Sequence, residues 1–219
     1  SRPDRPIVVV LTGTDLYEDF GRTAQVQESL VAAARIVVLQ ADALRYLPAN
    51  FAAKGAVIVQ SAVPPRRRLR SLQRSFEVCV SSHLRDVKDP LRSAIASRHL
   101  PRESRIRIHQ IGACIGEHWR RRVDREAQRN PRFHYGGSLP HWRALQILAR
   151  SRLVVISSRS EGAPNVASEA IACSVPILCT RISGMVGLLG PDYPGYFPVS
   201  DTAALTRLLW RTESDAEFY

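Results

Sequence analysis

Residues 153–179 read LVVISSRSEGAPNVASEAIACSVPILC, and their pattern indicates the class of fold. It opens with the apolar run Leu153–Ile156 and closes with Ile177–Cys179, and neither run alternates with polar residues. Continuous apolar runs of this length are typical of strands that are covered on both faces. Pro164 suits the first position of a helix, because its missing N–H would have no intrahelical partner there. The stretch therefore predicts strand, loop, helix and strand, which is the repeating unit of a parallel α/β sheet.

The same alternation extends outward over the rest of the chain. Other short runs rich in β-branched residues are Ile7–Leu11, Ile36–Leu39, Val57–Val59, Phe76–Val80 and Ile106–Ile111. Asp89–His99 and His141–Arg150 show the 3.6-residue apolar spacing of helices. We therefore expect an α/β protein built from Rossmann-like, doubly wound parallel sheets.

The segment from Ser61 to Ser75 interrupts this pattern. Pro64 and Pro65 cannot continue a helix or a ladder of strand hydrogen bonds. An arginine run follows, at Arg66, Arg67, Arg68, Arg70 and Arg74. The sequence predicts an N-terminal domain over residues 1–62, a linker over 63–75 and a second domain over 76–219. The first part is short for a domain of about 100 residues, so we expect an incomplete domain, truncated at its beginning.

Composition limits the possible functions of the chain. Its 219 residues carry a net charge of +11 and four cysteines without a C-x-x-C pair. The cysteines are expected to be buried free thiols in a reducing compartment, so we expect a cytoplasmic protein without a metal site. Since the sequence has neither an apolar run of membrane-spanning length nor a charged-then-apolar leader, we expect no membrane span and no secretion. The charge has three explanations: a solvated linker, a nucleic-acid surface, or a cleft that attracts a phosphorylated small molecule. Basic residues interleaved with stacking aromatics, which nucleic-acid binding favours, are missing.

The loop before the predicted helix at Pro164 has the features of an anion site. The backbone amides of Asn165 and Val166 lie at the positive end of that helix, where they are free to hold a phosphate oxygen. Gly162 lets a ligand approach the backbone closely. In open α/β sheets, ligands bind at this carboxyl end of the strands.

Glu161 and Glu169 flank the start of this helix, and their spacing resembles the E-x7-E motif of retaining GT-B glycosyltransferases. The resemblance implies that Glu169 accepts hydrogen bonds from the ribose of a nucleotide and that Glu161 lies beside the donor sugar. The alternative is structural: Glu161 caps the loop and Glu169 is a surface residue of the helix.

The run Phe76–Val80 leads into a second loop, which carries His83, Arg85 and Lys88. In the resembling glycosyltransferases this loop has an arginine and a lysine that clamp the donor pyrophosphate. Lys88 matches the lysine, whereas His83 stands where the arginine would be and Ser82 replaces a glycine. A histidine is only partly charged near neutral pH, and a neutral residue that caps the loop is the alternative for His83.

Candidates for the remaining parts of a site lie at two further turns. Thr14 and Asp15 follow the first predicted strand, where they would contact an acceptor, although Asp15 as a helix N-cap needs no function. His141 and Trp142 open a predicted helix and are candidates to line the cleft. A buried aromatic beside an N-terminal histidine is the alternative for this pair.

Several longer motifs narrow the resemblance. LTGTDLY (11–17), HLRDVKDP (83–90), LPHWRA (139–144), VISSRSEG (155–162) and VGLLGPDYPGYFPV (186–199) together are similar to the selenosugar synthases of selenoneine biosynthesis. The chain departs from that family at Ser82, Val87 and Ala163–Pro164.

The resemblance implies transfer of a sugar from a UDP-sugar to selenophosphate, with release of UDP and without an essential metal or other cofactor. The alternatives are a GT-B hexosyltransferase with a hydroxyl or lipid acceptor, and a non-catalytic basic nucleic-acid-binding protein.

Overall fold

The structure is a computed structural model and describes residues 5–17, 24–66 and 74–219. Of the arginine run in the predicted linker, Arg67, Arg68 and Arg70 lie outside the described residues. The chain divides into two compact units. The first contains Ser1–Ser61, Ser160–Pro164 and Ile182–Tyr193, and the second contains Ala62–Arg159, Asn165–Arg181 and Pro194–Tyr219. The boundaries expected after residues 62 and 75 stay a prediction.

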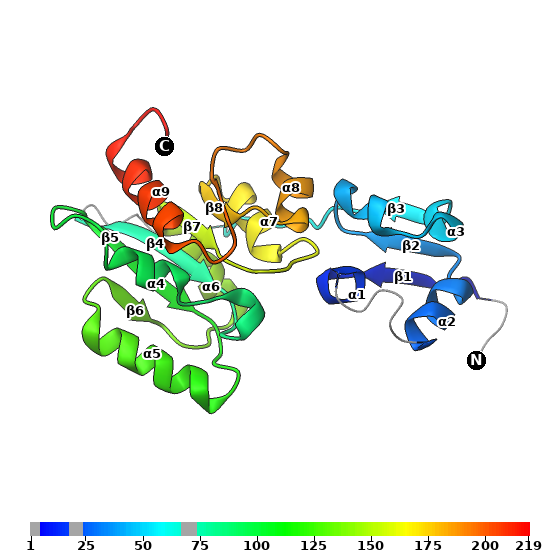
Figure 1. The fold of residues 1–219 in the computed structure, drawn as a ribbon, viewed down its shortest axis with the longest axis horizontal. Helices are drawn as coiled ribbons and strands as arrows, with labels where there is room; N and C mark the ends of the chain where they lie inside the picture. The colour runs from blue at the N-terminus through cyan, green and yellow to red at the C-terminus, as the bar shows by residue number, and fades with distance from the viewer. Residues whose placement is uncertain (1–4, 18–23, 67–73) are drawn as a thin grey trace. The chain divides into compact units, whose positions relative to one another are not determined.

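The second unit is built on a six-stranded parallel sheet with the order β6-β5-β4-β7-β8-β9 (Figure 1). The strands are β4 (Phe76–Ser81), β5 (Ile106–Ile111), β6 (Phe133–Tyr135), β7 (Leu153–Ile156), β8 (Ile177–Thr180) and β9 (Tyr196–Phe197). Successive strands are added on one side of β4 and then, from β7 onward, on the other. The strand order therefore reverses between β4 and β7, which is the arrangement of a doubly wound sheet.

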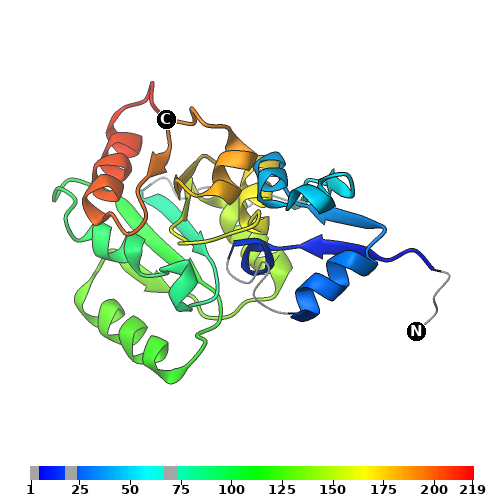
Figure 2. The ribbon, with the colours of Figure 1, turned by 45° about the vertical axis from the view of Figure 1, so that its right-hand side comes forward.

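Helices join these strands and cover the sheet, as the two views in Figures 1 and 2 show. They are η2 (Asp86–Lys88), α4 (Arg92–Ser97), α5 (Glu117–Arg129), α6 (His141–Arg150), α7 (Asn165–Ala172) and α9 (Thr202–Ser214). Helix α4 packs against α9, and α6 packs against α7. In α5 the buried residues Trp119, Val123 and Glu126 follow the spacing of one helix face, while the arginines of this helix are exposed.

Burial explains why the apolar runs form the central strands. β7 and β8 are buried along their whole length, and β4 is buried up to its last residue. Full burial of a Leu, Ile or Val side chain contributes about 1.5–3 kcal/mol. Leu153, Ile106 and Ile108 are at most 1% exposed, and all three lie in the main core cluster.

The first unit contains a three-stranded parallel sheet with the order β1-β2-β3 (Figure 1). Its elements are β1 (Val8–Leu11), α1 (Gly13–Tyr17), α2 (Ala24–Ala32), β2 (Arg35–Val38), η1 (Ala41–Tyr46), α3 (Ala49–Ala52), β3 (Gly55–Val57) and α8 (Ser183–Leu189). A separate core joins Leu11, Ile36 and Val38 of the sheet to Leu30 of α2 and Phe51 of α3.

Two polar side chains join elements of the first unit. Gln40 is fully buried; its amide donates to the Tyr17 hydroxyl at 2.9 Å, and its Oε1 accepts from the N–H of Ala43. The Tyr17 hydroxyl also lies 3.1 Å from the Ser183 hydroxyl of α8. Burial raises the pKa of Tyr17, so this hydroxyl stays protonated at neutral pH.

The α/β fold class and the parallel sheets expected from the sequence are confirmed. The third strand is the main misplacement, because β3 covers Gly55–Val57 rather than Val57–Val59. Gly55 and Ala56 pair with Ile36 and Val37, so neighbouring backbone rather than apolar character sets the bounds of this strand.

The helix expected over Asp89–His99 is shorter at both ends, since α4 covers only Arg92–Ser97. Asp89 has a left-handed backbone (φ 43°) and Pro90 follows, which delays the helix. Helix α7 begins at Asn165, one residue later than expected.

No helix in the described part of the chain has both the length and the apolar composition that crossing a bilayer requires.

Candidate functional site

The loops that follow β4 and β7 lie where the strand order of the second unit reverses, and polar contacts tie them together. The Ser157 hydroxyl donates to the carbonyl oxygens of Asp89 (2.9 Å) and Lys88 (3.2 Å). The N–H of Arg159 donates to the carbonyl of Val87 at 2.8 Å. The loop with Lys88 is therefore held directly against the end of β7. In a doubly wound sheet the ligand crevice opens at this reversal.

The β4 loop is also bound to the last residue of β5 and to the segment after it. Ser82 N–H donates to the Ile111 carbonyl at 3.0 Å, and Leu84 N–H donates to the Ala113 carbonyl at 2.8 Å. Gly112 lies between these contacts with φ +134°, and a Cβ at this position would be 2.0 Å from the Ser82 carbonyl oxygen. Only glycine fits here, because both the backbone conformation and the available space exclude a side chain.

His83 takes part in this second set of contacts. Its ring is exposed, and Nδ1 accepts a hydrogen bond from the N–H of Ala113 at 3.1 Å. An accepting Nδ1 carries no proton, so this contact requires the neutral ring with its proton on Nε2. The geometry is that of the loop-capping alternative, and contact of Nε2 with a ligand is compatible with it.

A pocket of about 260 Å³ lies beside this loop within the second unit. Its lining comes from the ends of β4 and β5 and from the start of α6: Ser81, Ser82, His83, Ile111, Gly112, Ser138, Leu139, His141 and Ala144. The hydroxyl of Ser82 is buried and has no hydrogen-bond partner among the described residues. The pocket thus offers hydroxyl and imidazole groups beside an apolar wall.

Glu169 lies on the second turn of α7, and its side chain is 16% exposed. Its Oε1 lies 2.7 Å from Nε2 of His141, the first residue of α6. Burial first, then the charges of Glu77 and Glu169, raises the pKa of Cys79 in β4 to about 12. The carboxylate of Glu169 is therefore held where α6 packs against α7.

The other expected residues of the second unit differ in their exposure to solvent. Lys88 is half-buried in the loop tied to β7, and Arg85, just before η2, is exposed. At the start of α7, Asn165 is exposed and Val166 is half-buried. Trp142 is 60% exposed, so its interpretation as a buried aromatic is wrong.

Glu161 and Gly162 group with the first unit, although the sequence places them directly before α7. Within that unit the backbone of Gly162 lies against Gly13, where a Cβ on Gly13 would be 2.6 Å from the Gly162 nitrogen. Glu161 is half-buried. Both glycines therefore serve a close approach of two backbone segments.

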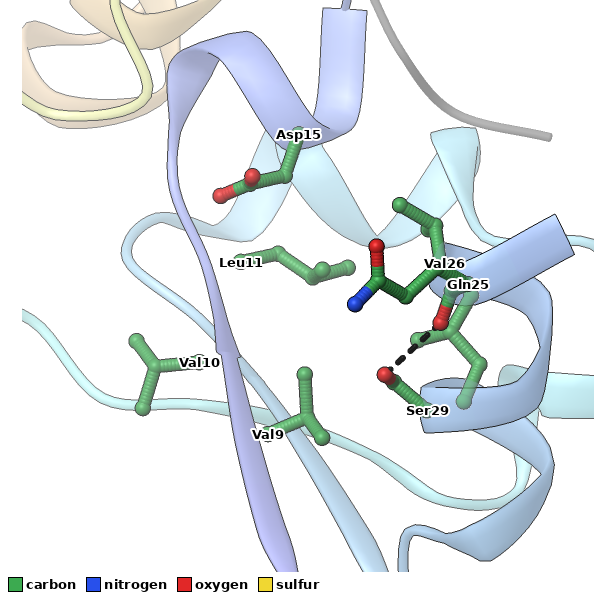
Figure 3. Close-up of a pocket in the computed structure, with 8 residues that line it drawn as sticks. Val9, Val10, Leu11, Asp15, Gln25, Val26 and Ser29 are labelled. Carbon is green, nitrogen blue, oxygen red and sulfur yellow. Dashed lines mark hydrogen bonds between the residues drawn. The ribbon is translucent and has the colours of Figure 1, made fainter. Parts of the chain in front are cut away.

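Asp15 lies inside α1 and is not its N-cap. Its Oδ2 accepts from the N–H (2.9 Å) and the hydroxyl (2.7 Å) of Thr12, which precedes the helix. This is the reciprocal half of a capping box. Asp15 also lines a pocket of about 290 Å³ formed with Val9, Val10, Leu11, Gln25, Val26, Ser29 and Leu30 (Figure 3). The side chain of Thr14 lies outside what the structure describes.

Among the described residues, no group of three or more His, Cys, Asp or Glu side chains is placed to hold a metal ion. The residues that the sequence interpretation missed are those that shape the loops, mainly Ser157 and Gly112. Each directly follows a strand that the sequence pattern predicts, and that position was the signal available in the sequence.

Comparison with known proteins gives one family. The family model of glycosyl transferases group 1 matches residues 66–218. A putative teichuronic acid biosynthesis glycosyltransferase, TuaC of Bacillus subtilis, is 32% identical over 79 residues, which are 36% of this chain and 20% of that protein.

Solved structures share the fold at low sequence identity. Anabaena HepE in complex with UDP and glucose has a TM-score of 0.76 at 15% identity, over 98% of this chain and 64% of that one. S. aureus TarM, a mutant in complex with fondaparinux, alpha-GlcNAc-glycerol and UDP, has a TM-score of 0.73 at 14% identity, over 97% and 45%. The chain thus spans less than two thirds of these relatives.

Proposed function

This chain belongs to the glycosyl transferases group 1 family, and on that premise we propose that the intact protein transfers a sugar from a UDP-sugar to selenophosphate. The observation that carries the donor half is the partly buried carboxylate of Glu169, which lies on α7, the helix that follows β7, and is held by His141. A carboxylate that is fixed in this way suits the hydroxyl groups of a ribose. HepE, which shares the fold, was solved with UDP and with UDP-glucose.

In this proposal the donor is held by groups from the β4 loop and from α7, both in the second unit. Glu169 accepts hydrogen bonds from the ribose. The pyrophosphate binds the backbone amides of Asn165 and Val166 and the ammonium group of Lys88. The amides at the start of α7 carry a partial positive charge, and the ammonium group carries a full one. Arg85 and His83 add donors from the same loop as Lys88.

The sugar and acceptor ends of the reaction are assigned to residues of the first unit. Glu161 and Gly162 lie beside the donor sugar, and Asp15 and Thr14 contact the acceptor. These assignments follow the E-x7-E and LTGTDLY motifs. The pocket beside Asp15 supports a role in binding, although the carboxylate also has a structural partner in Thr12.

Selenophosphate as the acceptor is supported by the motifs shared with selenosugar synthases and by the net charge of +11. Selenium attacks the anomeric carbon, a carbon–selenium bond forms, and the bond to the pyrophosphate oxygen breaks as UDP leaves with its electron pair. The nucleophile is a soft anion, so a positive environment helps more than a strong general base. Donors fixed around the pyrophosphate stabilise the charge that develops on it.

A second acceptor class is favoured by the match to TuaC, a putative glycosyltransferase of teichuronic acid biosynthesis. It would make the protein a hexosyltransferase that acts on a hydroxyl group. The two acceptors are separated by incubating the intact protein with a UDP-sugar and selenophosphate. Mass spectrometry of the product shows selenium bound to the sugar in the first case and none in the second.

The donor assignment is tested with Glu169→Ala. Loss of a charge-assisted hydrogen bond of about 1.5–3 kcal/mol weakens UDP binding about 10- to 100-fold. Titration calorimetry measures the affinity, and Glu117→Ala on α5, whose side chain is 69% exposed, is the matched control. Wild-type affinity in Glu169→Ala would refute the assignment.

The buried and half-buried cysteines of the described chain are all free, as is usual for proteins of a reducing compartment. This supports the cytoplasm as the location in which the proposed reaction takes place.

A further inference from the structure

The contact between His141 and Glu169 joins two helices through side chains that differ greatly in exposure. The His141 side chain is 74% exposed and the Glu169 side chain only 16%. Nε2 of His141 lies 2.7 Å from Oε1 of Glu169, well within hydrogen-bond distance. His141 opens α6 and Glu169 lies in α7, so the packing of these two helices sets the distance.

This contact is of little use to the stability of the fold. An ion pair or hydrogen bond with one largely exposed partner is screened by solvent and contributes little. Its effect on the geometry of Glu169 is larger. A glutamate side chain has several rotatable bonds, and a carboxylate without a partner would sample several positions. With Oε1 bonded to His141, the carboxylate is held in one of them.

The remaining oxygen of Glu169 is available to a ligand. Among the described residues, Oε2 has no hydrogen-bond partner. Helix α7, which carries Glu169, begins at Asn165, the candidate phosphate site. The ring of His141 also lines the 260 Å³ pocket, together with Ser82 and His83. His141 thus lies at the edge of a ligand-sized space and at the same time fixes the carboxylate.

We propose that His141 is a positioning residue that acts through Glu169: its Nε2–H holds Oε1 so that Oε2 accepts a hydrogen bond from a ribose hydroxyl of the nucleotide. The inference rests on the proposed function, because it assumes that a nucleotide is the ligand. It differs from a direct role in which His141 itself contacts the base or the phosphates. The two roles predict different dependence on the ribose hydroxyl groups.

The experiment compares UDP with 2′,3′-dideoxy-UDP, which keeps the base and the pyrophosphate but lacks both hydroxyl groups. Affinities are measured by titration calorimetry on the intact protein and on His141→Leu, His141→Gln and Glu169→Gln. His141→Leu removes the donor, and we expect it to weaken UDP about tenfold, the loss of one charge-assisted hydrogen bond. The affinity for the dideoxy analogue should stay unchanged. His141→Gln retains an N–H donor and should keep most of the affinity for UDP.

Two further variants separate positioning from general damage. His99→Leu is the matched control, since His99 is an exposed histidine outside the pocket, and its affinity for UDP should equal that of the wild type. In a Glu169→Gln background, adding His141→Leu should cause no further loss, because the group that His141 positions has already been changed.

The outcomes distinguish this inference from the proposal on which it rests. Equal weakening of UDP and of the dideoxy analogue in His141→Leu would overturn the inference and assign His141 a direct contact. Unchanged UDP affinity in His141→Leu would overturn it as well. No binding of UDP by the wild type would overturn the proposed function, and the positioning role with it. Selective loss of UDP affinity supports both.

Discussion

At the scale of single residues, buried charged groups of the second unit have partners. Glu126 is 1% exposed, and its carboxylate accepts hydrogen bonds from Arg98, Arg129 and Asn130. Asp89 is paired with Arg92 at 2.8 Å in the same way. Burial of an unpaired charge would cost several kcal/mol, so these contacts allow charged residues to occupy core positions. His109 is different, because it is partly buried and no carboxylate of the described residues pairs with it.

The first prediction concerns His109. Burial, and to a smaller extent His134 and Arg150, lower its pKa from 6.5 to about 4. Between these values the unfolded chain binds a proton that the folded chain does not. The free energy of unfolding therefore falls as the pH decreases from about 6.5 to about 4, by about 1–2 kcal/mol after allowance for solvent screening.

Urea unfolding of the wild type and of His109→Gln at pH 7 and pH 5 measures this contribution. The variant should lose less stability between the two pH values than the wild type. His99→Gln, at an exposed position, is the control and should follow the wild type. The same pH dependence in His109→Gln and in the wild type would show that His109 does not contribute.

At the scale of elements, strand ends are joined by loops that have little freedom. The segment after β5 contacts the β4 loop through hydrogen bonds at Ser82, His83 and Leu84. Gly112 makes these contacts possible, because a Cβ at this position would clash with the Ser82 carbonyl oxygen. The 260 Å³ pocket is built on this loop pair, so its shape depends on that glycine.

The second prediction compares two glycines with positive φ. A Cβ at Gly112 (φ +134°) would clash with the Ser82 carbonyl, whereas a Cβ at Gly137 (φ +72°) would meet nothing within 4 Å. Gly112→Ala should lower the free energy of unfolding by about 3 kcal/mol, through strain and overpacking together. Gly137→Ala should cost about 1 kcal/mol, from the backbone alone. Urea unfolding measures both, and equal losses would contradict the role of Gly112.

At the scale of the whole molecule, the net charge of +11 is compatible with a protein that binds anions. Exposed arginines on α5 carry part of this positive charge. Charge alone does not distinguish a nucleotide-sugar enzyme from a nucleic-acid-binding protein. The family match favours the enzyme.

The third prediction separates these classes by thermal unfolding of the intact protein. At a concentration of UDP about 100 times its Kd, binding stabilises the folded state by about 2.7 kcal/mol and raises Tm by about 5 °C. A single-stranded RNA or DNA oligonucleotide should leave Tm unchanged at 0.15 M salt. If the oligonucleotide raises Tm with a steep salt dependence and UDP does not, the chain is a nucleic-acid-binding protein.

The fold class and the positions of most central elements follow from the amino-acid pattern alone. β5, β7 and α6 have the bounds that the apolar pattern predicts. The reason is physical: burial on both faces demands continuous apolar runs, and a helix that packs on a sheet demands 3.6-residue spacing. Short elements carry too few residues for such a signal, so β6 and β9 were missed.

The contacts between candidate residues, in contrast, depend on how distant segments pack. His141 and Glu169 are 28 residues apart, and His83 and Ala113 are 30 apart, so helix packing and strand order determine both contacts. The same holds for residues 160–164 and 182–193, which group with the first unit although they flank strands of the second. Side-chain contacts between distant segments depend on packing that no local pattern records, and the choice between a capping and a ligand-binding role therefore needed coordinates.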